Sequence, residues 1–393
     1  MTKKQFSPLL FLASLGAGGI SVIPFALLQY THPHGKGLIN LSHINHHNLS
    51  FLQGVYFYSL EGVMVLFSLL HIGLSIYFIP KLFKWLKTQQ FKDMQADPLK
   101  NSALLTPFIS LVMTMNVFIG PIRFFIPYLS QNLQSFMLPA FLLWSVIWIA
   151  LIATDIKLLK ISFVNNFDIT KIHFGWLLHP FALAMLTVTG TGIAAMGENP
   201  TIAHSAAFLS FVSGTMAFFL FVVKLITLFK SHFEAKGLPD KQFLPSMLSV
   251  IPIVTLFAIS GFRIVHYFEH HHHIQLNGFS FFIVMIAYTF EVWYLLFGIV
   301  MLKDYIKKDF FKKEYYLSQW ALVCPFVAFA VLSSFVYKVF VPYPALMVIA
   351  ILSGSIAIAL NLKLLYRHIV CLRSSKMNEI TVNKNTKYAY NCS

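Results

Sequence analysis

Ten apolar stretches, each of about 20 residues or more, follow one another along this 393-residue chain. The hydrocarbon core of a bilayer is about 30 Å thick, so an α-helix needs roughly 20 apolar residues to cross it. Hydrophobic residues make up 57% of the chain and charged residues only 11%, which excludes a soluble domain of this size. The sequence therefore predicts an all-α membrane protein with ten transmembrane helices. The predicted spans are 7–28, 54–79, 103–125, 136–158, 173–196, 205–229, 244–267, 279–302, 317–340 and 343–366.

Lysine is concentrated in every second loop. The segments that follow spans 2, 4, 6 and 8 are rich in lysine, whereas those that follow odd-numbered spans have almost none. Cytoplasmic loops carry an excess of lysine and arginine, so the alternation predicts ten spans with both termini in the cytoplasm. The net charge of +15 has the same explanation, and no nucleic-acid partner is indicated. Residues 1–366 form the predicted transmembrane domain, and residues 367–393 form a polar cytoplasmic tail.

Proline follows the same alternation. The odd-numbered spans have proline in or near their bodies, whereas the even-numbered spans have it only at their ends. Proline removes a helical hydrogen bond and bends the chain, and in lipid the freed groups need a neighbouring helix or a water-lined cavity. This pattern predicts five helical hairpins whose odd helices form an inner ring around a central pore. The alternative is that proline is simply common in membrane helices and does not mark an inner ring. The prolines in question are Pro24, Pro107, Pro121, Pro180, Pro245, Pro252 and Pro325.

Three segments carry a family resemblance. Residues 320–331, WALVCPFVAFAV, are similar to a tryptophan–alanine…proline signature in a ninth helix. Residues 96–110, ADPLKNSALLTPFIS, look like a short cytoplasmic segment that leads into a third helix, and residues 244–261, LPSMLSVIPIVTLFAISG, look like a proline-containing seventh helix. The chain thereby resembles the tellurite-resistance/dicarboxylate transporter family, which includes TehA-like proteins and the plant slow anion channels.

The resemblance implies a ten-helix, quasi-fivefold bundle, a homotrimer with a pore through each protomer. It implies a channel or exporter for small inorganic or organic anions in the cell (inner) membrane, and not an enzyme. In the channel-like members a phenylalanine just before the proline of helix 9 plugs the pore. Cys324 stands at that position here, which leaves Phe326, Phe329 or another ring as the candidate plug, or a role for the thiol itself. Pore residues predicted on this basis are Cys324, Pro325, Phe326, Phe329, Pro180, Pro252 and Pro121.

Two arginines occur towards the outer ends of odd-numbered spans. Arg123 follows Pro121 in span 3, and Arg263 follows Gly261 in span 7. A membrane arginine is costly and faces a cavity or a partner. The functional interpretation is attraction of anions at the outer vestibule. The alternative is a side chain that snorkels to the interface, or that pairs with Glu61 or Glu291.

Histidine suggests two other classes of function. His43, His46 and His47 share one outer loop, and His270–His273 share another, where clustered imidazoles could bind a metal ion. Histidines in or near the spans could ligate a haem in a membrane oxidoreductase. They are not paired at matching depth in a repeated pattern, so no cofactor and no metal is assigned. A third hypothesis is a thiol-dependent sensor or transporter of sulfur species centred on Cys324, because a stabilised thiolate is reactive.

Overall fold

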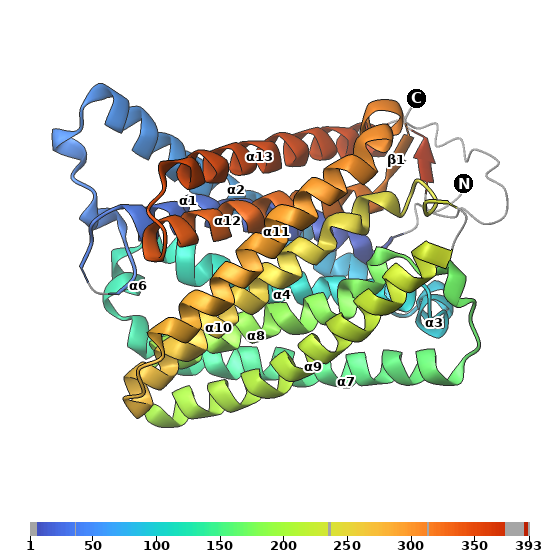
Figure 1. Cartoon of the computed structure of the whole chain (residues 1–393), viewed down its shortest axis with the longest axis horizontal. Coiled ribbons are helices and arrows are strands. Elements are labelled where there is room, and N and C mark those ends of the chain that lie inside the picture. Colours follow the sequence, from blue (N-terminus) through green and yellow to red (C-terminus); the bar gives the residue numbers. More distant parts are fainter. Residues whose placement is uncertain (1–5, 36, 235–236, 313, 374–388, 392–393) are drawn as a thin grey trace.

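The computed structural model describes residues 6–35, 37–234, 237–312, 314–373 and 389–391 (Figure 1). In these ranges ten helical segments are long and apolar enough to cross a membrane, which confirms the predicted all-α membrane protein with ten spans. The ten segments are Pro8–Thr31, Phe51–Trp85, Asn101–Phe125, Leu133–Val164, Phe174–Met196, Pro200–Glu234, Leu244–His272, Gly278–Phe310, Leu317–Tyr337 and Pro344–Cys371.

Most of these spans are built on one long α-helix each. The principal helices are α1 (Phe11–Thr31), α2 (Phe51–Trp85), α4 (Thr106–Val117), α7 (Met137–Val164), α8 (Leu178–Met196), α9 (Pro200–Glu234), α10 (Val250–His272), α11 (Asn277–Tyr305), α12 (Val323–Val339) and α13 (Pro344–Arg373). Shorter elements are α3 (Gln89–Ala96), α5 (Arg123–Phe125), α6 (Pro127–Gln131), and the strands β1 (Glu314–Tyr316) and β2 (Ala389–Asn391), which pair antiparallel.

Each odd-numbered span begins with a 3₁₀ segment that passes directly into an α-helix. These segments are η1 (Pro8–Leu10), η4 (Asn101–Leu105), η8 (Phe174–Leu177), η9 (Leu244–Ser249) and η11 (Leu317–Leu322), which precede α1, α4, α8, α10 and α12.

The prolines of four odd spans lie in the first turn of the α-helix that follows this segment. Pro107 is the second residue of α4, and Pro180, Pro252 and Pro325 are the third residues of α8, α10 and α12. A 3₁₀ segment precedes each of these turns without a break, so each proline lies inside a continuous helical span, where it lacks the N–H that would bond the preceding turn. These prolines therefore mark the change from 3₁₀ to α geometry within the span.

Three further prolines lie within helices. Pro24 is inside α1, as expected for an odd span. Pro121 lies in η5 (Phe118–Ile122), a π-helical turn between α4 and α5. Pro80 is inside α2, because α2 continues to Trp85, so the expectation that even spans have proline only at their ends is wrong for α2.

The helices of the odd-numbered spans contact one another in a closed circuit. Helix α1 packs on α4, α4 on α8, α8 on α10, α10 on α12, and α12 on α1. The helix of each even span packs on the helix that precedes it, as α2 does on α1 and α9 on α8. Figure 1 shows these long helices running side by side through one bundle.

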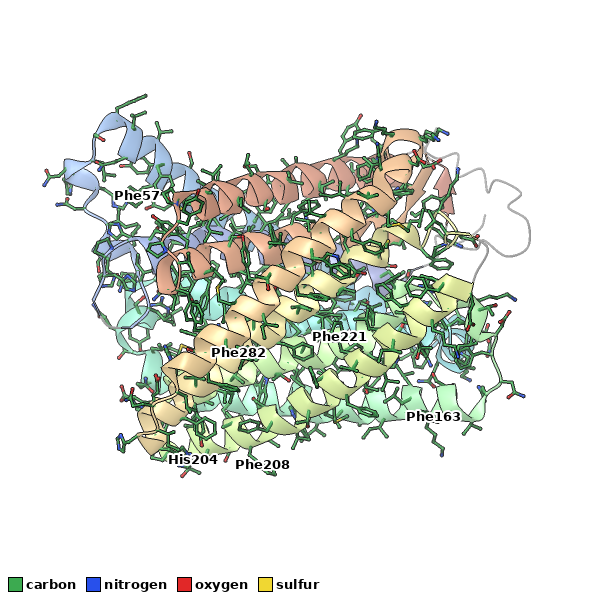
Figure 2. All side chains as sticks on the ribbon, viewed as in Figure 1. Phe57, Phe163, His204, Phe208, Phe221 and Phe282 are labelled. Atoms are coloured by element: carbon green, nitrogen blue, oxygen red, sulfur yellow. The ribbon has the colours of Figure 1, made fainter. Side chains whose placement is uncertain are left out.

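Burial differs sharply between the two sets of spans. In the most apolar part of each odd span, 56% to 100% of the residues are buried, whereas the even spans have only 17% to 33% buried. Phe163 of α7 and Phe208 of α9 project outward from even spans and are 89% and 67% exposed (Figure 2). Apolar side chains on the even helices therefore form the surface that lipid tails can cover.

Close packing around α8 depends on one glycine. A Cβ atom on Gly190 would lie 2.2 Å from Cζ2 of Trp144 on α7 and 2.3 Å from Oγ of Ser210 on α9. The indole Nε1 of Trp144 donates a hydrogen bond to the carbonyl oxygen of Leu186 at 3.0 Å. Glycine thus lets three helices approach closely, as small residues do in membrane proteins.

The C-terminal boundary differs from the prediction. Helix α13 ends at Arg373, seven residues beyond the predicted last span. Of the predicted tail, residues 374–388 and 392–393 lie outside the described part of the chain.

Candidate functional site

A cavity of about 100 Å³ lies where the odd-numbered spans begin. Every one of the five spans contributes to its wall, together with the segments that lead into them. The span residues that line it are Leu9, Leu12, Ser102, Ala103, Gly175, Leu178, Phe181, Ser246, Ser249, Pro252, Leu317, Ser318, Ala321 and Cys324. The starts of the five odd-numbered spans therefore converge on one small space, through the first turns of α1, α8, α10 and α12 and through η4.

Hydrogen bonds between the 3₁₀ segments hold neighbouring span starts together. Thr106 donates from Oγ1 to the carbonyl oxygen of Pro8 at 2.6 Å, which ties α4 to η1. Ser102 donates from Oγ to the carbonyl oxygen of Gly175 at 3.1 Å, which ties η4 to η8. Ser318 donates from Oγ to the carbonyl oxygen of Gln242, just before η9. These hydroxyl groups anchor the walls of the cavity.

His173 joins the starts of spans 5 and 7. Its ring stacks on Phe243 with the centroids 3.8 Å apart, and its Nδ1 accepts a hydrogen bond from the Gly175 backbone amide at 3.2 Å. Loss of hydration in this setting lowers the pKa of His173 to about 4, and the backbone of Leu99 and the charge of Asp97 only partly oppose that effect. The imidazole is therefore neutral near pH 7 and adds no charge to the cavity wall.

The electrostatics of the cavity come mainly from the backbone. An α-helix carries a partial positive charge towards its N-terminus, and all five odd-numbered spans begin at this cavity. The first amides of the α-helices are paired with the preceding 3₁₀ segments, as the amide of Leu178 is with the carbonyl oxygen of Gly175. Lys100 also lines the cavity, with its Nζ 2.6 Å from Oδ2 of Asp97. The remaining wall is largely aliphatic and aromatic.

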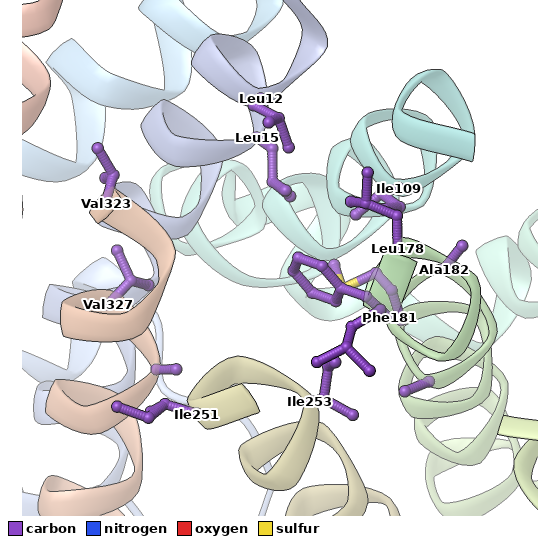
Figure 3. Close-up of a cluster of buried hydrophobic side chains, with 14 of the residues drawn as sticks. Leu12, Leu15, Ile109, Leu178, Phe181, Ala182, Ile251, Ile253, Val323 and Val327 are labelled. Atoms are coloured by element: carbon purple, nitrogen blue, oxygen red, sulfur yellow. The ribbon is translucent and has the colours of Figure 1, made fainter. Parts of the chain in front are cut away.

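Phe181 is the aromatic side chain of α8 that reaches this space. It is 5% exposed and lines the cavity. Figure 3 shows its ring extending from α8 into the cluster between helices, near Leu15 of α1 and Ile253 of α10. Cys324 of α12 lines the same cavity. Helices α8 and α12 therefore each contribute a side chain to its wall, and the aromatic ring comes from α8.

Of the other predicted pore residues, one lines the cavity and the others do not. Pro252 lines the cavity, whereas Pro121, Pro180 and Pro325 are buried and are not among its lining residues. Phe326 is partly buried, and Phe329 stacks on Tyr288 of α11 with 5.5 Å between centroids. Phe329 thus faces a neighbouring helix.

Arg123 is held by backbone oxygens. Its Nε donates to the carbonyl oxygen of Ile119 at 2.8 Å, and its Nη2 to that of Ile39 at 2.6 Å. Its Nη1 donates to Oγ of Ser130 at 3.1 Å. The side chain is 2% exposed. This geometry ties the first inter-span loop to the end of span 3.

Arg263 contacts neighbouring helices of the odd-numbered spans. Its Nη1 donates to the carbonyl oxygen of Val188 on α8 at 2.5 Å, and the guanidinium interacts electrostatically with Tyr30 of α1. A Cβ atom on Gly192 would lie 3.1 Å from the same Nη1. Arg263 therefore lies between α10, α8 and α1, three helices of the closed circuit. Neither arginine has an ion pair with Glu61 or Glu291 among the described residues.

Glu61 and Glu291 each accept a hydrogen bond from a side chain on another element. Glu61 accepts from Nε2 of His46 at 2.8 Å, which joins α2 to the outer loop. Glu291 is fully buried and accepts from Oγ1 of Thr255 at 2.6 Å, which joins α11 to α10.

The histidines do not gather into a recognisable metal centre. In the described ranges no group of three or more His, Cys, Asp or Glu side chains is arranged to hold a metal ion. His71 has both ring nitrogens engaged, Nδ1 with the carbonyl oxygen of Ser14 at 2.7 Å and Nε2 with Oγ1 of Thr114 at 2.8 Å. His204 and His272 each contact the hydroxyl of Tyr267, at 2.7 and 3.1 Å. This geometry gives no support to the haem or metal hypotheses.

Sequence reasoning overlooked Phe181, Asp155 and Lys224. Phe181 follows the proline of span 5 directly, just as Phe326 follows the proline of span 9, and this repeat was a usable signal. Asp155 and Lys224 are charged residues within predicted spans 4 and 6, which is itself a signal of function in a membrane.

The fold defines a polytopic helical membrane protein whose first turns meet at one cavity. The model of the voltage-dependent anion channel family matches residues 5–369, nearly the whole chain, and the chain belongs to this family. The resemblance noted in the sequence is thereby confirmed. Compared with curated proteins, the chain gives no significant match.

Proposed function

We propose that this protein conducts small anions along the axis of the circuit formed by α1, α4, α8, α10 and α12. The even-numbered helices would surround this inner ring and face lipid. Membership of an anion channel family supports the class of substrate. The closed contacts and the greater burial of the odd spans support the inner-ring arrangement.

One observation carries the proposal, namely the cavity at which the five odd-numbered spans begin. An anion that enters it meets the partial positive charge of the helix N-termini and needs no charged side chain as a partner. The path narrows there between Phe181 and Cys324, with apolar neighbours that exclude water.

Arg263 serves as the attracting charge in the other half of the path. It lies between three helices of the circuit, and its Nη1 donates a hydrogen bond to the Val188 carbonyl oxygen. Arg123 has a structural role instead, because three acceptors surround its guanidinium.

The protein lies in the cell (inner) membrane with both termini in the cytoplasm, so that the cavity opens on the cytoplasmic side. Lysine-rich segments after even spans support this orientation. We further propose a homotrimer with one path in each protomer. The protein moves anions without chemical conversion of a substrate.

Anion flux into proteoliposomes tests the proposal. We expect Cys324→Phe to block flux and Cys324→Ala to keep or raise it, because the residue lines the narrow cavity. Val146→Phe is the matched control, since it adds the same ring on an exposed face of α7 that is 64% accessible. Absence of flux for every small mono- or divalent anion in the wild type would overturn the proposal. Equal flux in Cys324→Phe, Cys324→Ala and Val146→Phe would show that this cavity is not the constriction.

A further inference from the structure

Three ionisable side chains meet behind the start of α8, on the side away from the cavity. Nδ1 of His179 lies 2.6 Å from Oδ1 of Asp155 on α7, and both residues are fully buried. Lys224 of α9 is 3% exposed, and its Nζ donates to the carbonyl oxygen of Trp176 at 3.2 Å. The ammonium also lies 4.2 Å from the centroid of the Trp176 ring. Asp155 and Lys224 both act electrostatically on His179.

Two atoms of this cluster have no hydrogen-bond partner in the part of the chain that the structure describes. Oδ2 of Asp155 and Nε2 of His179 are both buried and unpaired. When His179 donates from Nδ1, its Nε2 is an acceptor, so both unpaired atoms are proton acceptors. A buried unsatisfied polar atom is destabilising, so such atoms are uncommon in a purely structural cluster.

When the imidazole of His179 is neutral, the negative charge of Asp155 and the positive charge of Lys224 cancel. One added proton gives the cluster a net positive charge in a region of low dielectric constant, where the three groups must move apart or rearrange.

The cluster is attached to the cavity wall through a short piece of chain. Lys224 holds the carbonyl of Trp176 in η8, and Asp155 holds His179. His179 does not line the cavity, whereas its neighbours Leu178 and Phe181 on the same turn of α8 do. A change in the cluster therefore acts on the first turn of α8, which carries the aromatic ring of the constriction.

Other charged groups on the surrounding helices point elsewhere. On α7, Lys157 and Lys160 are exposed. On α9, His232 packs its ring on Phe174. Helix α4 contains no charged residue, and on α10 Arg263 bonds Val188, nine residues further along α8. Asp155 and Lys224 are thus the charges that face His179.

We propose that Asp155, His179 and Lys224 form a proton-binding site that couples protonation to the position of Phe181, so that flux increases when the cluster takes up a proton. The ligand is H⁺, and it binds at the unpaired Nε2 of His179 or Oδ2 of Asp155. No covalent bond other than N–H or O–H forms. The effect on flux rests on the proposed anion path, whereas proton binding itself does not.

Flux measured against pH in proteoliposomes tests the coupling. In the wild type we expect flux to rise as the pH is lowered. Asp155→Asn keeps an acceptor for His179 but removes the negative charge, so the midpoint moves to lower pH. Lys224→Met removes the opposing positive charge, so the midpoint moves to higher pH. Each shift is roughly one pH unit or more, as expected for loss of an adjacent charge. A merely structural role would not move the midpoint in opposite directions.

Glu291→Gln is the matched control, because Glu291 is a fully buried carboxyl on α11 that bonds Thr255. We expect it to keep the wild-type midpoint. Flux that is present in all variants with one common pH profile would overturn the coupling and leave the anion path standing.

Infrared difference spectra of the wild type provide a second readout that needs no flux. A change in the imidazole and carboxyl bands between pH 8 and pH 5 that disappears in Asp155→Asn supports the proton site. Identical spectra in both proteins would overturn it. If no anion flux occurs at any pH, the proposed function fails, and the spectra still decide whether the cluster binds a proton.

Discussion

Phe181 of α8 and Cys324 of α12 line the same cavity, although they lie on different helices. In the proposed anion path, the bulky ring and the small thiol would together form the constriction. The proposal thereby accounts for a narrow path even though position 324 holds a small residue.

Phe181→Ala is expected to raise anion flux by roughly three- to tenfold, because a hydrophobic constriction that excludes water becomes wider. Phe163→Ala is the control, since Phe163 is 89% exposed on α7 and lies outside the cavity. Flux in proteoliposomes under a fixed anion gradient is the measurement. An unchanged rate in Phe181→Ala, with the protein correctly folded, contradicts a gate at this ring.

Modification of Cys324 is expected to reduce flux. Its thiol is free and lines the cavity, so a small methanethiosulfonate reagent would add bulk at the constriction. Flux would be measured before and after treatment, with Cys324→Ala as the control that should not respond. Equal inhibition of both proteins would show that the reagent acts at another residue.

The number of spans could be predicted from sequence because each span must satisfy its backbone hydrogen bonds within lipid, and this requirement leaves a long apolar run. The change from 3₁₀ to α geometry within a span could not be predicted in this way. Pro180 and Pro325 looked like sites of mid-helix bending, but each lies in the first turn of an α-helix. Proline fits either position, and only the preceding 3₁₀ segment distinguishes them.

The candidate site was only partly predictable. Cys324, which its place before a proline singled out in the sequence, lines the cavity, while its role in a pore stays a prediction. The two arginines looked equivalent in the sequence, and only the acceptors around each guanidinium separate Arg123 from Arg263. Which face of α8 carries Phe181 and which carries His179 depends on tertiary packing, since neighbouring residues on a helix point in different directions.

The two arginines are expected to respond differently to loss of charge. Arg263→Gln should reduce anion flux several-fold with little loss of stability, and Arg263→Lys should restore part of the flux. Arg123→Gln should lower thermal stability by about 1–3 kcal/mol, because backbone oxygens of Ile39 and Ile119 lose a donor in a buried place. Flux and thermal unfolding in detergent are measured side by side. A larger loss of stability in Arg263→Gln than in Arg123→Gln would reverse these assignments.

Gly190→Ala is expected to destabilise the bundle by about 1–3 kcal/mol, since overpacking forces neighbouring side chains out of position. The new Cβ would lie 2.2 Å from Cζ2 of Trp144. Gly73→Ala on α2 is the control, because nothing lies within 4 Å of a Cβ at that position. The melting temperature in detergent is the measurement, and equal melting temperatures for the two variants would contradict close packing at Gly190.

His173 is expected to make stability depend on pH. Its pKa falls from 6.5 to about 4 on folding, mainly because burial disfavours the charged ring. The unfolded chain therefore binds a proton at a higher pH than the folded chain does. The stability contributed by the neutral ring is complete above pH 6.5 and is lost as the pH falls towards 4, by about 1–3 kcal/mol in total.

His173→Asn tests this dependence, because asparagine removes the titration and keeps an acceptor for the Gly175 amide at the start of η8. Thermal unfolding is compared at pH 7.5 and pH 4.5 for both proteins. We expect the variant to lose less stability than the wild type over this interval, although it starts lower through loss of the stack on Phe243. Parallel losses in the two proteins would mean that other groups, and not His173, set the acid sensitivity.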